Sequence, residues 1–246
     1  HIKDRPTNDD VNMTTVAYRT PGMSGAELAR VVNEACLAAV KQGRNTISVA
    51  DFDHAVSTVV MGKARTSAVV SEEDKRITAW HEAGHTVAAM VLPDANDPVS
   101  VSIVPRGAAG GITWMSGTDA QYLTRRKAYA QLVVSMAGRA AEEKLLEGEF
   151  TSGPHGDLQA ATNLASAMVT SYGMTSSGLM IRSEGLMASG SQATDEVVFE
   201  IEKMLFEALQ KARSVLCENE KLFLNVVEAL LCEETLSEPD LLVLKE

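Results

Sequence analysis

Apolar residues recur every three to four positions through most of the chain, the pattern of helices that bury one face. In the stretch from Asp157 to Gly173, for example, Leu158, Ala161, Leu164, Ala165 and Met168 fall on one side. Glycine, proline or a polar cap residue marks the ends of such stretches. The pattern predicts helices over residues 24–43, 48–62, 71–92, 124–148, 157–173, 195–217 and 219–232, followed by a short turn capped by Ser237.

Three of these helices begin at a recognisable cap. Each starts with a serine that has an acidic residue three positions later: Ser24 and Glu27, Ser48 and Asp51, Ser71 and Asp74. The serine oxygen can accept a backbone N–H of the first turn, and the acid can bond back to the serine N–H. Two capped helices within about 60 residues predict a small helical domain. Residues 63–70 lack periodicity and are the expected linker.

Two short stretches predict strands. Residues 98–105 alternate apolar with polar side chains between two prolines, and residues 112–115 follow a glycine-rich loop. The edge of such a pair either accepts an extended peptide as an additional strand or belongs to an ordinary hairpin, and the sequence favours neither. Residues 176–194 are rich in glycine and serine, which predicts a mobile loop.

Composition narrows the function classes. The 246 residues suffice for one large or two modest domains, and 45% hydrophobic with only 4% aromatic residues favours helices packed on helices. A net charge of −11 without a basic block argues against a nucleic-acid or anionic-lipid surface. The three cysteines form no C-x-x-C pair and suit a reducing compartment. No signal peptide or long apolar run is present, so we expect a soluble chain and, since it starts at His1, a fragment.

One motif carries chemistry. His81, Glu82 and His85 form an H-E-x-x-H pentad, which arises by chance in a chain of this length on the order of once in a hundred sequences. Two histidines four apart share one helix face and can bind one Zn²⁺, while the glutamate can take a proton from a water on the metal. The alternative is a surface helix with two incidental histidines and a solvated glutamate.

A catalytic zinc site usually has a third protein ligand. The pattern that continues with glycine and histidine fails, because Ala88 and Val91 occupy those places, and no glutamate occurs between His85 and Glu142. The remaining candidates are Asp94, Asp97, Asp119, Glu142, Glu143, His155 and Asp157. Asp94 and Asp97 sit in a proline-bounded loop, where aspartate commonly forms turns.

Several separate stretches resemble the FtsH-type AAA proteases, and together they cover nearly the whole chain. The peptidase part matches at Ile77-Thr78-Ala79-Trp80-His81-Glu82-Ala83-Gly84-His85, Asp97-Pro98, Ile103-Val104-Pro105-Arg106-Gly107, Ala137-Gly138-Arg139-Ala140-Ala141-Glu142-Glu143, Thr151-Ser152-Gly153 and Asp157-Leu158. Upstream, Thr20-Pro21-Gly22, Ser24-Gly25-Ala26 and Asn33-Glu34-Ala35 resemble the helical lid of the AAA ATPase. The resemblance implies a mainly α fold, with a lid in residues 1–65 and, in residues 66–246, a helical zinc-peptidase domain with a small β-sheet.

Carried over position by position, the resemblance implies that His81, His85 and Asp157 bind one Zn²⁺ per chain, with Glu82 as general base. Glu142 matches an acid that lies near the metal and contacts a ligand rather than the ion. The implied activity is that of a zinc-dependent endopeptidase.

The resemblance also implies substrate-binding positions. These are Val101, Ile103, Gly110 and Gly111. Two departures from the family pattern bear on substrate preference: Trp80 stands where tyrosine is usual, and Gly110-Gly111-Ile112 replaces the more common leucine-glycine-tyrosine. Neither departure removes a catalytic group.

Membership further implies a homohexameric ring into which ATP-driven translocation feeds unfolded polypeptide. The chain has no G-x-x-x-x-G-K-[ST] motif, so ATP is expected only in an upstream ATPase part. By the same analogy, the full-length protein is anchored, by a segment outside this chain, in a bacterial inner membrane or an organelle membrane, with the peptidase in a reducing aqueous compartment.

Two other function classes remain to be compared with this interpretation. An inactive relative would keep the fold as a ring-forming interaction or chaperone module without the chemistry. A zinc-stabilised structural domain would have a closed, cysteine-rich site, and none of the three cysteines lies near these motifs. Zinc content measured together with casein cleavage distinguishes the three classes.

Overall fold

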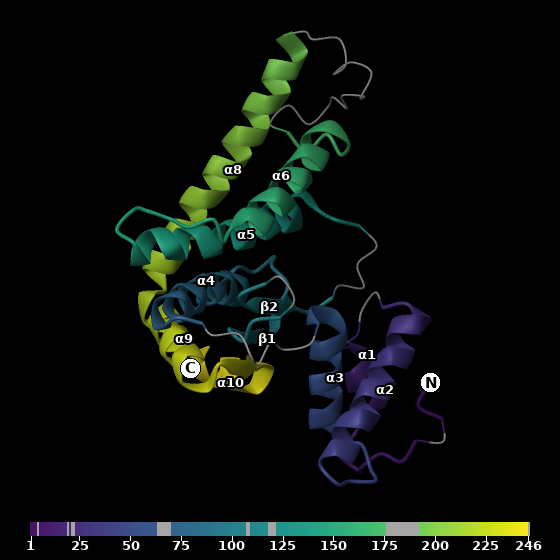
Figure 1. Cartoon of the computed structure of the whole chain (residues 1–246). Helices are drawn as coiled ribbons and strands as arrows, with labels where there is room; N and C mark the ends of the chain where they lie inside the picture. Colours follow the sequence, from purple (N-terminus) through teal and green to yellow (C-terminus); the bar gives the residue numbers. More distant parts are fainter. Residues whose placement is uncertain are drawn as a thin grey trace.

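The computed structural model describes residues 1–3, 5–18, 20, 23–62, 70–106, 109–117, 122–175 and 192–245. Most of the predicted linker, residues 63–69, lies outside this part, as do residues 176–191 of the predicted mobile loop. The described residues are mainly helical, with one small antiparallel sheet, as predicted (Figure 1). Among them, no helix combines the length and the apolar character that crossing a membrane requires.

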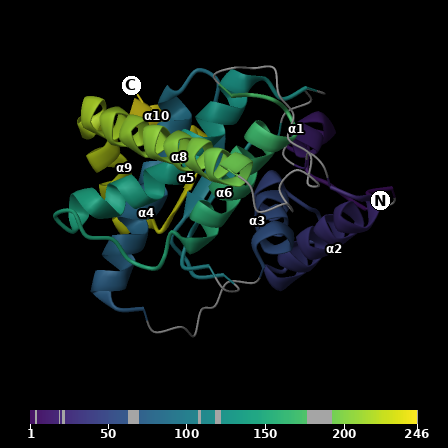
Figure 2. The same ribbon diagram turned by 90° about the horizontal axis from the view of Figure 1, so that it is seen from above.

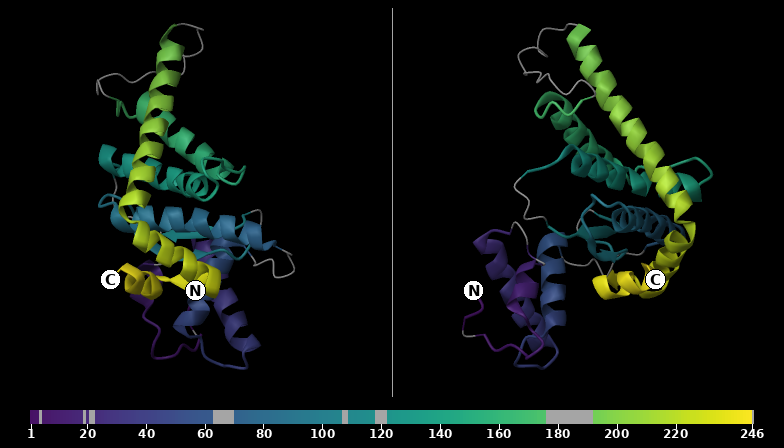
Figure 3. Two further views of the ribbon diagram at one scale, coloured as in Figure 1. Left: turned by 90° about the vertical axis from the view of Figure 1, so that its left-hand side faces the viewer. Right: turned by 180° about the vertical axis from the view of Figure 1, so that it is seen from behind.

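The first helices fold around a small core of their own. They are α1 (Met13–Tyr18), α2 (Gly25–Lys41) and α3 (Val49–Met61), and they stand as a group beside the other helices (Figure 3). Their core consists of Val31, Ala35, Ile47, Phe52, Ala55 and Val56. Of the three predicted capping boxes, the two in this part of the chain are present, at Ser24 and Ser48. The caps thus place the starts of α2 and α3 as the sequence indicated.

Helix α4 (Glu72–Val91) is at the centre of the remaining residues. It packs against α5 (Arg125–Leu145) on one side and α9 (Glu220–Glu233) on another, while α8 (Gln192–Glu218) crosses α5 and α6 (His155–Thr170) (Figure 2). Every residue of α4 from Glu82 to Met90 is buried. Gly84 makes the close approach of α5 possible, because a Cβ there would collide with the carbonyl oxygen of Ala137.

The sheet packs against α4 and has the strand order β2-β1-β3. The strands are β1 (Pro98–Ser102), β2 (Ile112–Met115) and β3 (Thr235–Ser237), all antiparallel to their neighbours. Val101 on the central strand lies opposite Thr113 of β2 and Leu236 of β3. β1 is therefore paired along both edges, and β2 lies at an edge of the sheet.

Residues of the last two helices, α9 and α10, contact α4. The ring of Phe223 on α9 packs edge-on against Trp80, with 5.1 Å between ring centroids. At the end of α10 (Glu238–Lys245), the Nζ of Lys245 donates a hydrogen bond of 2.8 Å to the carbonyl oxygen of Met90. This contact satisfies one of the free carbonyls at the C-terminal end of α4. Trp80, which departs from the family pattern, thus serves packing between helices.

The structure differs from the sequence prediction at several boundaries. β1 ends at Ser102, not at residue 105, and α6 begins at His155, two residues before the predicted Asp157. α8 begins at Gln192, inside the stretch predicted to be a loop. The sequence did not predict β3. It did predict Ser237 as a cap, and the Oγ of Ser237 donates a hydrogen bond of 2.6 Å to Asp240. Three residues are too few for a periodic signal, and their partner strand lies about 130 positions away.

Candidate metal centre

Two helices bring three metal-binding side chains together. His81 and His85 lie one turn apart on α4, and their Nε2 atoms are 3.0 Å apart. Asp157, in the first turn of α6, places Oδ2 at 3.2 Å from Nε2 of His81 and 3.5 Å from Nε2 of His85. Within the described part of the chain, these three residues form the group whose ligand atoms all lie within 4.8 Å of one another.

The ring of each histidine is oriented by a hydrogen bond at its other nitrogen, Nδ1. Nδ1 of His81 donates 2.9 Å to Oε1 of Glu142, and Nδ1 of His85 donates 2.7 Å to the backbone carbonyl of Val134. Both partners come from α5. A proton on each Nδ1 leaves the Nε2 lone pairs directed at one point, the tautomer that metal binding needs.

Glu142 is itself fixed by the loop that follows α5. Its side chain is 1% exposed, and its second carboxylate oxygen accepts from the backbone N–H of Thr151 at 2.8 Å and from the Thr151 hydroxyl at 2.9 Å. Burial alone would raise the pKa of Glu142, but the bonds from His81 and Thr151 outweigh burial and lower it. Glu142 therefore stays ionised and orients His81 without joining the ligand group.

The electrostatics of the centre favour a positive charge between the rings. Burial opposes protonation of His81, yet its hydrogen bonds with Asp157 and Glu142 prevail and raise its pKa from 6.5 to about 10. The pKa of Asp157 is held below its usual range, since its bonds with His81 and His85 outweigh burial. Either a proton or a metal cation can supply that charge. Two imidazoles and one carboxylate, with oriented rings, fit a catalytic Zn²⁺ site.

Glu82 lies beside this group but is not part of it. The residue is 6% exposed, and its Oε2 accepts a 2.7 Å hydrogen bond from the hydroxyl of Thr113 on β2. Burial raises the pKa of the Glu82 carboxyl. A carboxylate with a raised pKa, held at one oxygen, is suited to accept and return a proton near neutral pH.

Gly138 makes room for both rings. α5 runs unbroken through this residue. A Cβ there would lie 2.5 Å from Nε2 of His85 and 2.6 Å from Cε1 of His81, closer than real Cβ contacts. The close approach of α5 to the two histidines therefore depends on a residue without a side chain.

A cleft of about 920 Å³ opens over the metal-binding group. Gly110 and Gly111 line it, as the family resemblance implied, and the backbone at Gly111 comes close to Glu82. Val101 and Ile103 do not reach it: they are 0% and 5% exposed, in the hydrophobic core. Because β1 is the central strand, its backbone is also occupied on both edges. The structure thus does not place these two residues where a substrate can touch them.

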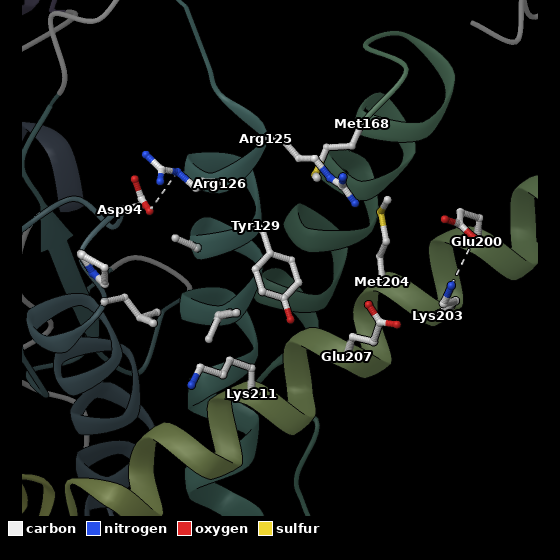
Figure 4. Close-up of a pocket in the computed structure, with 14 residues that line it drawn as sticks. Asp94, Arg125, Arg126, Tyr129, Met168, Glu200, Lys203, Met204, Glu207 and Lys211 are labelled. Atoms are coloured by element: carbon white, nitrogen blue, oxygen red, sulfur yellow. Dashed lines mark ion pairs between the residues drawn. The ribbon is translucent and has the colours of Figure 1, made fainter. Parts of the chain in front are cut away.

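The other predicted ligand candidates lie elsewhere. Asp94 faces Arg126, 3.6 Å away, in a separate cavity between α5 and α8 (Figure 4). Glu143 pairs with arginines on α5 and α8, and Asp97 is exposed ahead of β1. His155 lines the cleft but is exposed and lies outside the ligand group. Asp119 falls outside the described residues.

Sequence reasoning missed the groups that orient the site. The hydroxyl of Thr113 and the carbonyl of Val134 carry no motif, since any residue supplies a carbonyl and threonine is common in strands. Thr151 lies in a stretch that matched the family, but its bonds to Glu142 become visible only in three dimensions. The one available signal was the closeness of these residues to matched motifs.

Comparisons with known proteins agree with this geometry. Residues 68–244 match the model of peptidase family M41, and residues 10–54 match that of the AAA+ lid domain. The chain is similar to proteins named ATP-dependent zinc metalloprotease FtsH. With that of Mycoplasma pneumoniae it shares 37% identity over 98% of its length and 35% of the relative's. With the protein of that name from Bacillus subtilis it shares 34% identity, over 96% of its own length and 39% of the relative's length. The chain thus spans somewhat over a third of these relatives.

Proposed function

Because the chain belongs to peptidase family M41, we propose that it is the zinc-dependent peptidase module of an ATP-dependent protease and hydrolyses peptide bonds in unfolded polypeptides. The observation that carries this proposal is the group of His81, His85 and Asp157, with Glu82 beside it and the cleft above. An inactive relative would not need Glu142, Val134 and Thr113 to orient His81, His85 and Glu82.

The domain division is part of the proposal. Residues 1–65 would form the C-terminal lid of an AAA ATPase module, and residues 66–246 the peptidase domain. The two separate hydrophobic cores support this division, as do the separate family matches over residues 10–54 and 68–244. ATP would bind only to a part of the protein outside this chain. For the full-length protein we further propose a homohexamer, attached to a bacterial or organelle membrane by a segment outside this chain.

The chemistry follows from the oriented groups. His81, His85 and Asp157 would hold one Zn²⁺, which as a Lewis acid polarises the scissile carbonyl and acidifies water for attack near neutral pH. Glu82 takes the proton of the attacking water and passes it to the leaving amine. The bond from Thr113 fixes one Glu82 oxygen and leaves the other available for this transfer. Burial of Glu82 keeps bulk water from competing for its proton.

The experiment is to replace Glu82 by glutamine and to measure zinc content beside casein cleavage. We expect zinc content to stay at one per chain, since both histidines and Asp157 remain, and the cleavage rate to fall by about 10²–10⁴-fold. If the Glu82→Gln variant cleaved casein at the wild-type rate, Glu82 would not be the general base. A wild-type chain that binds zinc but never cleaves casein would favour the inactive-relative alternative.

A further inference from the structure

The cavity between α5 and α8 measures about 580 Å³ and is separate from the cleft over the metal-binding group (Figure 4). The two have no lining residue in common. Small-molecule sites in proteins typically measure roughly 300–1,000 Å³, so this cavity is large enough for an organic ligand. The proposed peptidase chemistry does not use it.

The floor of this cavity is apolar and belongs to the packed core. It is formed by residues of α5, α6 and α8 and by the residue that follows α4: Leu92, Tyr129, Ala130, Val133, Met168 and Met204. Val133 and Met168 are 0% and 1% exposed, so a ligand seated here would contact fixed core side chains. The unbranched methionines adapt to irregular apolar shapes. Such a floor suits a hydrocarbon chain.

Charged side chains surround the opening. Four are cations and three are carboxylates: Arg125, Arg126, Lys203 and Lys211, with Asp94, Glu200 and Glu207. Arg126 lies 3.6 Å from Asp94, and Lys203 lies 3.9 Å from Glu200. The rim therefore has one positive charge in excess, in a chain whose net charge is −11. A ligand with a single negative charge would balance the rim, whereas a dianion would exceed it.

The start of α5 is the place for that negative charge. Arg125 is the first residue of α5 and has no ion-pair partner in the described part of the chain. The first turn of α5 contains no acidic residue, so the partial positive charge of the helix N-terminus is also uncompensated. Figure 4 shows Arg125 extending toward Met168, at the end of the cavity opposite Lys211. Burial and the nearby Glu207 raise the pKa of Tyr129, so the middle of the cavity favours uncharged groups.

We propose that this cavity binds a free fatty acid, with the carboxylate at Arg125 and the hydrocarbon tail along Tyr129 and Val133. α5 rises roughly 12 Å between Arg125 and Val133, which gives an extended tail a matching length. One excess charge is too little for an anionic bilayer, since membrane-binding clusters contain about four to eight cations. The inference does not depend on the peptidase function, because none of these residues belongs to the metal centre.

Isothermal titration calorimetry of this chain with dodecanoate, below the concentration at which it forms micelles, tests the proposal. We expect one molecule per chain with Kd on the order of 10–100 µM. Dodecanol, which has the tail without the charge, and acetate, which has only the head group, should each bind at least about tenfold more weakly. From hexanoate to dodecanoate, each added methylene should tighten binding about two- to fourfold, with no further gain once the tail exceeds the cavity.

Arg125→Gln removes the unpaired cation from an exposed position, so the fold should persist. The dodecanoate Kd should rise about tenfold, to the value for dodecanol. Lys127→Gln is the matched control. Lys127 lies in the same first turn and loses the same charge, but it does not line the cavity. This variant should keep the wild-type Kd.

Equal affinity for dodecanoate and dodecanol, or a wild-type dodecanoate Kd in Arg125→Gln, would overturn the proposal. Binding to phosphatidylglycerol vesicles without binding of free dodecanoate would assign this face to a membrane instead. If dodecanoate does not bind and light scattering shows that Arg125→Gln dissociates a wild-type assembly, a second copy of the chain covers the cavity and the proposal fails. Absence of casein cleavage would overturn the proposed function and leave these titrations unaffected.

Discussion

Replacing Gly138 by alanine tests whether α5 sets the position of the zinc ligands. The new Cβ would lie 2.5 Å from Nε2 of His85 and 2.7 Å from Nε2 of His81, whereas ordinary contacts begin at 3.4 Å. The rings or the helix must therefore move by about 1 Å. Metal–ligand distances tolerate only about 0.2 Å, so the two nitrogens and Asp157 can no longer meet one ion correctly. We expect zinc affinity to fall by about 10–100-fold or more.

The stability of the metal-free chain should respond differently. Alanine inside a helix is favoured over glycine by about 0.5–1 kcal/mol, which offsets part of the ring displacement. The metal-free melting temperature should therefore move by only a few degrees, while the extra stabilisation by added zinc largely disappears. Titration against a competing chromophoric chelator, beside thermal melts with and without zinc, measures both quantities.

Gly156→Ala is the control for this experiment. Gly156 is also a helical glycine, immediately before Asp157, but a Cβ there meets nothing within 4 Å. Its zinc affinity should stay at the wild-type value. Wild-type affinity in Gly138→Ala as well would refute the argument that α5 fixes the histidines by direct contact.

Three further outcomes are expected. Asp157→Asn should weaken zinc binding sharply, and His155→Ala should leave it nearly unchanged; chelator titration giving the reverse order would contradict the ligand assignment. Thr113→Val should keep zinc and lower kcat/KM roughly tenfold or more, since the hydrogen bond from the Thr113 hydroxyl to Glu82 is lost. An unchanged kcat/KM would show that this bond does not assist Glu82 as the base. Arg44→Ala should lower the melting temperature most at pH 7 and somewhat less at pH 3: Arg44 holds the pKa of buried Asp51 well below its usual range, so this stability is present above about pH 4 and is lost gradually as the pH falls from there toward the lowered pKa. An equal loss at both pH values would contradict that origin.

The sequence predicted what is encoded locally. Serine caps fixed the starts of α2 and α3, and helical spacing placed His81 and His85 on one face, because such signals extend over only three or four residues. The groups that complete the site come from elsewhere in the chain. Val134 contributes a carbonyl that any residue would supply, and no single-sequence pattern reports that kind of contact.

Long-range strand pairing limited the prediction in a second way. Alternation correctly suggested a strand near Val101, but it could not show that β3 would cover its second edge. Without that strand, Val101 and Ile103 had the pattern of an exposed edge and were assigned to substrate binding by resemblance. With it, both are core residues. Burial depends on the partner, and the partner lies at the other end of the domain.

That same strand also bears on the order in which this sheet can form during synthesis. β1 is synthesised about 133 residues before β3, so at roughly 5–20 residues per second its second edge stays unpaired for roughly 7 to 27 s. Trp80, next to the first histidine, also lacks its Phe223 partner over that interval, and in its later part, once Asp157 has been made, all three zinc ligands are already present. A nascent chain that ends before α9 therefore carries all three ligands while α4 lacks its packing against α9 and β1 lacks its β3 partner.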